Sequence, residues 1–279
     1  MNFGASSPAI PPPPAPDGDP SRTISVFATD SLGRDLRVYN YSGWHDFRSF
    51  VKRGDHYEDR VGGAEPVSAA ILRPKVVQLT FGGWEPWEER GLSPWHMDRL
   101  MEMIGPERTG DVREFFLIGG INDVRENLSD AGRLNPSDEG FRGEVRHAVG
   151  GILTAMIRAA DAFPRARVYY LGSGQLSPEP KRGENPEVLA QVGEWLRYDI
   201  PTIVRNSLDC HDRLRAIELT YLKVGPEYPS TIPRLNADFA GRVWGDQMPS
   251  DCFRSRDHYG HLSRIGSQKV IANVESLFK

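Results

Sequence analysis

Residues 114–123 read EFFLIGGIND, an apolar run that ends in two glycines and an Asn-Asp pair. An uninterrupted apolar run is typical of a strand that is covered on both faces, because a strand with one wet face would alternate. Similar runs occur at residues 24–28, 75–81 and 167–171, and a weaker fifth run occurs at 216–222. The first four end in glycine or in small polar residues. We therefore predict five buried strands.

Helical patterns separate these runs. Ser93-Pro94 is typical of an N-cap followed by the first helical position. Apolar residues recur at three- and four-residue steps from 141 to 163 and again from 263 to 278. The segment 187–208 has a helical pattern but contains Pro201, which predicts a break. Alternating strands and helices predict an α/β fold with three α/β/α layers around a mostly parallel, five-stranded sheet.

Composition excludes several classes of protein. Of the 279 residues, 39% are hydrophobic and 26% are charged, as in an ordinary globular protein. A formal net charge of −4 argues against nucleic-acid binding through an overall positive field. The apolar runs are far shorter than the roughly 18 residues of a membrane span. Cys210 and Cys252 have neither the spacing of a zinc site nor the number for a disulfide framework. We expect no nucleic-acid partner, no membrane association and no metal.

The N-terminal residues 1–21 have a different composition from the rest and include four consecutive prolines, Pro11–Pro14. Such a run favours extended polyproline geometry and buries little surface, which predicts a disordered tail ahead of a single domain at 22–279. The alternative is a docking segment for a proline-reading domain. The tail lacks the basic start and apolar core of a secretory signal, so we expect a cytoplasmic or otherwise intracellular location.

Residues able to carry out acyl chemistry follow the predicted strands. In open parallel sheets, ligands bind beyond the carboxyl ends of the strands, where Ser31, Gly83 and Asn122 would meet. A serine hydrolase needs a base for its serine, a carboxylate for that base and donors for the oxyanion. His261 and Asp257 supply the first two types. A serine after a strand is commonly only a helix cap, so the complete set indicates the chemistry and no single residue does.

Four blocks of the sequence resemble those of the SGNH (GDSL-type) hydrolases. Thr29-Asp30-Ser31-Leu32 resembles the family's Gly-Asp-Ser-Leu, and Phe81-Gly82-Gly83-Trp84 resembles its second block. Gly120-Ile121-Asn122-Asp123 matches the third block, Gly-X-Asn-Asp, at every position, and Asp257–His261 resembles the last, Asp-X-X-His. The blocks occur in the family's order. The resemblance implies a flavodoxin-like fold and the hydrolysis of carboxylic esters without a metal or organic cofactor.

The resemblance also implies a role for each residue. Ser31 would form an acyl intermediate, with His261 as its base and Asp257 as the carboxylate that orients the imidazole. Ser31 N–H, Gly83 N–H and the Asn122 side chain would bind the oxyanion. A small acyl ester or an O-acetylated carbohydrate is the implied substrate.

The residues beside these blocks suggest where the substrate would lie. Trp84 and Asp123 would contribute to a pocket next to the oxyanion donors. A tryptophan could stack on a sugar or aromatic ring there, and the alternative is that Trp84 anchors the following helix on the sheet.

The sequence departs from the family pattern in two places. Thr29 stands where the family has glycine, and Asp257 lies four residues before His261 instead of three. Asp251 or a backbone carbonyl is therefore an alternative partner for the histidine. The interval between Ser31 and Gly83 is also long, which predicts an insertion at about 35–74. Because an apolar stretch ends at Gly43, that glycine is an alternative oxyanion donor to Gly83.

Two further classes of function compete with an active esterase. A catalytically inactive relative that binds carbohydrate or protein would fit the irregular spacing before His261. A nucleotide-binding domain is disfavoured because the chain has neither a G-x-G-x-x-G nor a phosphate-binding-loop motif in the required context. A metal hydrolase built on Asp257, His258 and His261 would lack additional clustered ligands.

Overall fold

The computed structural model describes residues 20–40, 44–60, 67–124, 139–179, 186–209, 234–254 and 260–278. Several predictions lie outside these ranges: most of the N-terminal tail, the strand at 216–222, and the residues Gly43, Cys210, Asp257 and His258. At the predicted boundary of the tail, Pro20–Arg22 form a 3-10 turn that leads into the first strand.

The described strands form one seven-stranded sheet and a separate pair. The order in the large sheet is β4-β3-β6-β1-β7-β8-β9, and every neighbouring pair is parallel except β3 with β4. Its strands are β1 (Ile24–Thr29), β3 (Trp44–Arg53), β4 (His56–Asp59), β6 (Lys75–Gly82), β7 (Val112–Ile118), β8 (Arg167–Tyr170) and β9 (Leu235–Asn236). The pair consists of β2 (Val38–Tyr39) and β5 (Val67–Ser68).

The mostly parallel sheet is confirmed, but its described part has seven strands instead of the predicted five. The strands β6-β1-β7-β8-β9 have the 2-1-3-4-5 order of flavodoxin-like folds. β3 and β4 extend this core beyond β6, and they lie within the interval 35–74. Apolar runs could not reveal them, because β3 mixes apolar residues with polar and charged ones and β4 is largely exposed.

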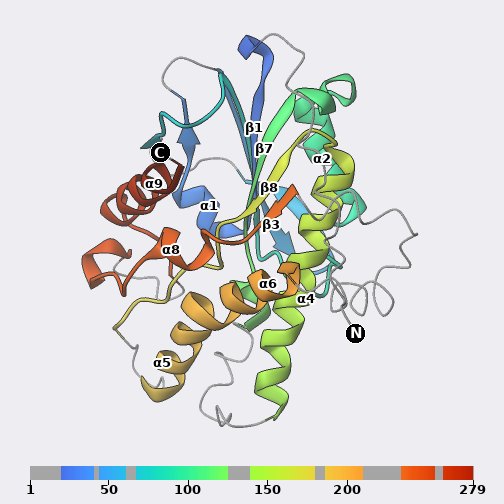
Figure 1. Ribbon diagram of the computed structural model, residues 1–279. Helices are drawn as coiled ribbons and strands as arrows, with labels where there is room; N and C mark the ends of the chain where they lie inside the picture. Colours follow the sequence, from blue (N-terminus) through green and yellow to red (C-terminus); the bar gives the residue numbers. More distant parts are fainter. Residues whose placement is uncertain are drawn as a thin grey trace, which may run out of the picture.

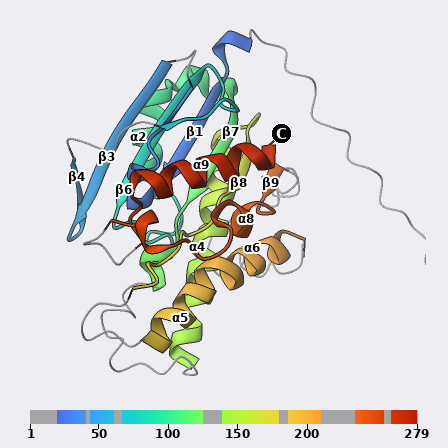
Figure 2. The ribbon, with the colours of Figure 1, turned by 90° about the vertical axis from the view of Figure 1, so that its left-hand side faces the viewer.

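The helices lie on both faces of the sheet, which confirms the three-layer arrangement (Figure 1). One face carries α1, α8 and α9, and the other carries α2 and α4 (Figure 1). Figure 2 shows α9 crossing in front of the strands. The helices are α1 (Ser31–Asp35), α2 (Pro94–Ile104), α4 (Glu139–Ala162), α5 (Pro186–Glu194), α6 (Ile200–Asp209), α8 (Ala240–Trp244) and α9 (Arg264–Phe278). None of the helices in the described ranges is both long and apolar enough to cross a bilayer.

Two local predictions for the helices are confirmed. Ser93 is the N-cap of α2, with Pro94 as its first residue and an extended backbone at the cap. The helical segment near Pro201 is interrupted, because α5 and α6 are separated by a π turn at Trp195–Asp199. Proline has no N–H and its ring clashes with the carbonyl four residues earlier, so a wide turn just before Pro201 relieves the conflict.

The core explains why the central strands are mostly apolar. Every residue of β1 and β6 is buried, since helices cover both faces of these strands. Phe27 of β1 stacks on Phe116 of β7, with 4.6 Å between the ring centroids. A fully buried side chain of this size contributes about 1.5–3 kcal/mol. The packed strands hold the loops at their carboxyl ends in fixed positions.

Candidate active site

Ser31 begins helix α1 directly after the central strand β1. Asp30 is the N-cap: its backbone is extended, and its carboxylate accepts a 2.9 Å hydrogen bond from Leu32 N. Asp30 N also donates to Ile118 O of β7 at 3.0 Å. The half-buried Ser31 is therefore presented at the carboxyl edge of the sheet by a turn that is fixed on both sides.

The turn at Ser31 requires a glycine two residues later. A Cβ on Gly33 would lie 1.7 Å from Thr29 Oγ1, so no larger side chain fits there. Thr29 is itself buried, and its hydroxyl donates to the carbonyl of Asp30 at 3.1 Å. The threonine at the position where the SGNH family has glycine is thus accommodated by a contact with the backbone of the same turn.

Burial dominates the titration of Asp30. The side chain is fully buried, and in the described part of the chain its Oδ2 has no hydrogen-bond partner. Desolvation raises its pKa to about 7; the bond from Leu32 and the charge of His261 lower it, and Asp35 raises it further. The interactions with His261 and Asp35 show that these two groups lie close to the residue before Ser31.

Asp30→Asn should make stability less dependent on pH. An unfolded Asp30 ionises near pH 4, whereas the folded one keeps its proton until about pH 7. Stability should therefore fall as pH rises from 4 to 7, and the loss should be complete above pH 7. The asparagine keeps a capping oxygen and carries no charge, so we expect its free energy of unfolding at pH 8 to exceed the wild-type value by about 2–4 kcal/mol.

Urea denaturation of Asp30→Asn and wild type at pH 4, 6 and 8 measures this difference. The two proteins should differ least at pH 4, where Asp30 is protonated in the folded state and only about half ionised in the unfolded state. An asparagine variant that is less stable than wild type at pH 8 would contradict the assigned protonation of Asp30.

His261 forms a short contact with a carboxylate on α1. Its Nδ1 lies 2.7 Å from Asp35 Oδ2, and the next backbone N–H, that of Leu262, donates to the same oxygen at 3.1 Å. Asp35 is fully buried and His261 is largely buried. Gly260 has a φ of +83°, and a Cβ there would lie 2.0 Å from Gln175 O, so the turn into His261 requires glycine.

This contact fixes the role of each ring nitrogen. A carboxylate beside Nδ1 holds the proton on that nitrogen and leaves Nε2 as the acceptor, which is the tautomer of a general base. Ser31 and Asp35 begin and end the same five-residue helix, so about 6 Å of helical rise separates them. Asp35, which binds the imidazole, thus lies roughly one helical turn along α1 from Ser31. Catalytic hydrogen bonds often tighten only with substrate present.

Asn122 and Asp123 join the loops that follow β7 and β6. Asn122 Nδ2 donates to Trp84 O at 2.9 Å, and Asp123 Oδ1 accepts from Trp87 N at 2.9 Å. Both side chains are buried. The two loops are therefore held together at the same edge of the sheet where Ser31 begins α1. The second amide hydrogen of Asn122 is chemically able to donate to a developing oxyanion.

Gly82 ends strand β6 close to Ser31, and Gly83 follows it. A Cβ on Gly82 would lie 3.8 Å from the Ser31 Cβ, so the backbone at Gly82 passes close to the serine. Gly83 has a φ of +81°, and a Cβ there would approach the Cβ of Lys52 to 3.2 Å. Lys52 is itself held by Glu85 at 2.7 Å. Since Gly43 lies outside the described residues, its alternative role as an oxyanion donor is not addressed by these contacts.

The prediction that Trp84 lines a pocket does not fit its position. Its side chain is fully buried, and its indole N–H donates to Gly91 O at 3.1 Å. Gly119 packs on the indole ring so closely that a Cβ would lie 2.6 Å from it. Trp84 therefore anchors the loop after β6 to the core, which was the alternative interpretation of the sequence. Aromatic residues after a strand do not reveal from sequence whether they face a ligand or the core.

Asp35 is the candidate site residue that the sequence analysis missed. The predicted carboxylate, Asp257, lies outside the described residues, whereas Asp35 contacts the imidazole directly. The signal was the four-residue spacing between Ser31 and Asp35, which places both on one face of a helix. The sequence instead predicted Asp35 to begin an insertion, because the block that contains His261 has a carboxylate of its own, Asp257.

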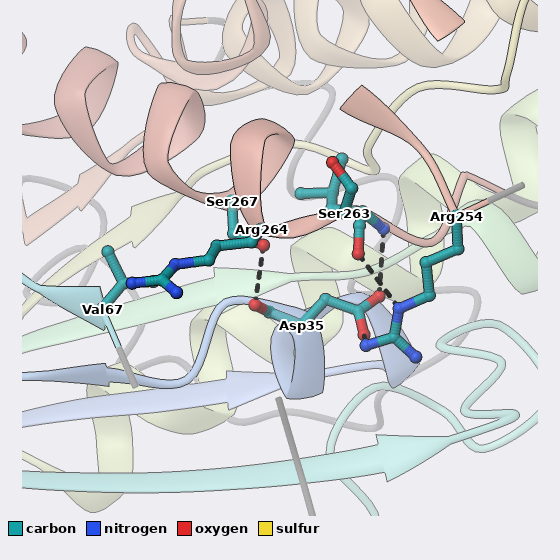
Figure 3. A pocket seen from close by; sticks show the side chains of 7 residues that line it. Asp35, Val67, Arg254, Ser263, Arg264 and Ser267 are labelled. Atoms are coloured by element: carbon teal, nitrogen blue, oxygen red, sulfur yellow. Dashed lines mark hydrogen bonds and ion pairs between the residues drawn. The ribbon is translucent and has the colours of Figure 1, made fainter. Parts of the chain in front are cut away.

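Two cavities lie near these loops. One of about 300 Å³ borders Asp35 and is lined by Asp35, Val67, Arg254, Leu262, Ser263, Arg264 and Ser267 (Figure 3). The other, of about 230 Å³, is lined by Leu176, Ser177, Pro178, Pro186, Leu189, Ala190, Gly193, Glu194, Arg197 and Gln247. Among the described side chains, no group of three or more His, Cys, Asp or Glu could hold a metal ion.

Comparisons with known proteins give only distant similarities. No protein-family model matches the sequence, and no curated protein is similar to it at a significant level. Among solved structures, a lipase from a goat rumen metagenome is 12% identical, with 91% of this chain and 96% of that chain covered and a TM-score of 0.46. A lipase/acylhydrolase from Enterococcus faecalis is 8% identical, with 91% and 94% covered and a TM-score of 0.42. At these values the fold assignment rests on the strand order, and the site has to be interpreted from its own contacts.

Proposed function

We propose that this protein is a serine hydrolase that cleaves carboxylic esters through an acyl-Ser31 intermediate. The observation that carries the proposal is the short contact between His261 Nδ1 and the buried carboxylate of Asp35, one helical turn from Ser31. This contact gives a histidine the tautomer of a base and binds it to the helix that Ser31 begins. The four sequence blocks that resemble the SGNH hydrolases support the same function.

Ester cleavage then follows in two steps. His261 Nε2 takes the proton of Ser31 Oγ while the oxygen bonds to the ester carbonyl carbon, and a tetrahedral oxyanion forms. The protonated imidazole gives this proton to the leaving alcohol as the ester C–O bond breaks. A water molecule attacks the acyl-serine with His261 again as base, and the carboxylic acid leaves with Ser31 restored. Asp35 keeps the imidazole in place and stabilises its charged form.

Backbone and side-chain donors would stabilise the oxyanion. We assign Ser31 N–H, a backbone N–H at Gly83 and the Asn122 amide to this role. The hydrogen bond from Asn122 Nδ2 to Trp84 O supports the assignment, because it holds the amide group in a fixed orientation at the edge of the sheet. Donors that are fixed before the reaction stabilise a transition state without reorganisation.

Asn122→Ala should lower kcat by about 10²–10³-fold and change KM little, since the amide acts on charge that develops after binding. Steady-state kinetics on p-nitrophenyl acetate measures both constants. Asn273→Ala is the matched control: it removes an amide of the same kind on α9, which donates to Val243 O at 2.9 Å, and should remain within about threefold of wild type. A kcat for Asn122→Ala equal to that of the control would remove Asn122 from the oxyanion site.

The smaller cavity suggests a short acyl group. At about 230 Å³ it lies below the 300–1,000 Å³ of typical ligand pockets. It begins at Leu176, next to Gln175, whose carbonyl packs on Gly260 beside His261. We assign this cavity to the acyl part, which predicts that p-nitrophenyl acetate and butyrate are hydrolysed faster than long-chain esters. An O-acetylated carbohydrate is a substrate of the same class.

Labelling with a fluorophosphonate probe tests the proposal directly. The probe reacts with a serine only where the hydroxyl is activated, so stoichiometric labelling of Ser31, located by peptide mass spectrometry, is the expected result. A folded wild-type protein that neither reacts with the probe nor hydrolyses any ester would favour the inactive binding module that the sequence left open.

A further inference from the structure

We propose that Arg254 is a positioning residue of this site, which holds Asp35 and His261 in register and sets the pH range of the reaction. The inference rests on the proposed function. Arg254 lies outside all four sequence blocks and was not among the residues expected to act. It ends the last described segment before His261, and its side chain reaches the buried carboxylate on α1.

Arg254 contacts both partners of the Asp35–His261 pair. Its Nη2 lies 2.5 Å from Asp35 Oδ1, and its Nε donates to Leu262 O at 3.1 Å. Its backbone N–H donates to His261 O at 2.9 Å, next to the antiparallel bridge between Phe253 and Leu262. One residue thus connects the carboxylate, the backbone of the histidine and the residue after it.

The two oxygens of Asp35 have separate partners. Oδ2 accepts from His261 Nδ1 and Leu262 N, while Oδ1 faces the Arg254 guanidinium. This division prevents the carboxylate from rotating and keeps Oδ2 directed at the imidazole. The carboxyl end of α1 is also fixed, because Ser267 Oγ donates to Asp35 O at 2.8 Å (Figure 3). The orientation of the base therefore depends on Arg254.

Arg254 also brings a positive charge to a carboxylate without solvent contact. Asp35 is 0% exposed, whereas the Arg254 side chain is 41% exposed in the larger cavity. A buried carboxylate requires such compensation. The other charged groups around the pair are Arg34 on α1, with its Nε 3.9 Å from Asp35 Oδ1, and Asp30 before α1. Arg264 of α9 lines the same cavity, but its side chain extends toward Val67 (Figure 3). Among the described residues, Arg34 and Arg254 both form ion pairs with Asp35, and the guanidinium of Arg254 is the closer, at 2.5 Å instead of 3.9 Å.

Removing this charge should change the pH profile. A cation beside Asp35 disfavours the protonated imidazole, so its loss favours protonation of the base. For Arg254→Gln we expect the acidic limb of kcat/KM on p-nitrophenyl acetate to move to higher pH by about half a unit to one unit. We also expect the plateau value to fall by about 10–100-fold, because the carboxylate and the histidine loop lose a shared anchor.

Two further variants separate positioning from charge. Arg254→Lys keeps the charge but loses the planar set of guanidinium donors. The acidic limb of kcat/KM should therefore stay near its wild-type pH, while the plateau value of kcat/KM still falls. Arg264→Gln removes an equal charge from the wall of the same cavity and should leave both quantities nearly unchanged. The proposal is overturned if the acidic limb of kcat/KM does not move in Arg254→Gln. It is also overturned if the limb moves by the same amount in Arg264→Gln.

Other measurements keep the test independent of folding and of the proposed function. Circular dichroism and Tm confirm that each variant is folded; if Arg254→Gln is not, a wild-type plateau in Arg254→Lys still overturns the proposal. An NMR pH titration of the His261 ring should show its midpoint at higher pH in Arg254→Gln, even in a protein without esterase activity. Absence of turnover and of fluorophosphonate labelling in wild type would refute the proposed function, while an unshifted NMR midpoint would refute the role of Arg254.

Discussion

Ser31→Ala is expected to lower kcat/KM for ester hydrolysis by about 10⁴–10⁶-fold, which is the largest effect that any single substitution in this chain should produce. The Oγ atom is the nucleophile in the proposed reaction, and no neighbouring hydroxyl lies at the start of α1 to replace it. Residual activity would come only from binding and from the oxyanion donors, which remain after the nucleophile is lost.

The structural cost of Ser31→Ala should be small. Ser31 is half-buried, and the turn around it is held by Asp30, Leu32 and Gly33 without its side chain. The Tm should therefore remain within a few degrees of wild type. Ser276→Ala, at an exposed position on α9, is the matched control and should keep full activity. Full activity in Ser31→Ala would end the proposal of an acyl-Ser31 intermediate.

Asp35→Asn should have the second largest effect, a fall in kcat of about 10⁴-fold. An amide at this position can present its NH₂ group to His261 Nδ1, which moves the ring proton to Nε2 and leaves no base facing Ser31. Fluorophosphonate labelling should slow in parallel, because it needs the same activated hydroxyl. Arg254 and Arg34 would lose their counter-charge, so the variant should also unfold at lower denaturant concentration.

Asp257→Asn is the control that decides which carboxylate acts. The substitution is matched to Asp35→Asn in size and charge, and Asp257 is the residue that the SGNH-like block itself would supply. We expect Asp257→Asn to retain kcat within about threefold of wild type. The reverse result, a large loss in Asp257→Asn and a small one in Asp35→Asn, would show that the block works as the sequence implied.

The central strands and the main helices followed from the sequence because the physics that forms them is local. Residues 24–28, 75–81 and 114–118 are mostly apolar since both faces of their strands are covered, and this pattern can be recognised without knowing which strands are neighbours. β3 and β4 were missed because β3 mixes apolar with polar and charged residues, and β4, at the edge of the sheet, is largely exposed. β9 has only two residues, which is too few for a pattern.

The candidate site was predictable to the extent that each residue follows a strand. Ser31 and Asn122 could be found this way, and His261 could be found from its block near the C-terminus. The partner of His261 could not, because Asp35 and His261 are 226 positions apart and meet only when α9 packs beside α1. Arg254 was missed for the same reason: its guanidinium acts across the interface between two distant segments, and nothing in its neighbours along the chain marks it.

The short helix α1 has a mechanical consequence. Because Ser31 and Asp35, the proposed nucleophile and carboxylate, lie on a single helical turn, no conformational change can separate them without unfolding that turn. His261 lies on a different segment of the chain, which begins at Gly260 among the described residues. A change in the distance between His261 and Ser31 would therefore require movement of that segment. Slow hydrogen exchange of the α1 amides, combined with faster exchange around Gly260, would identify the segment with His261 as the moving part and α1 as the fixed part.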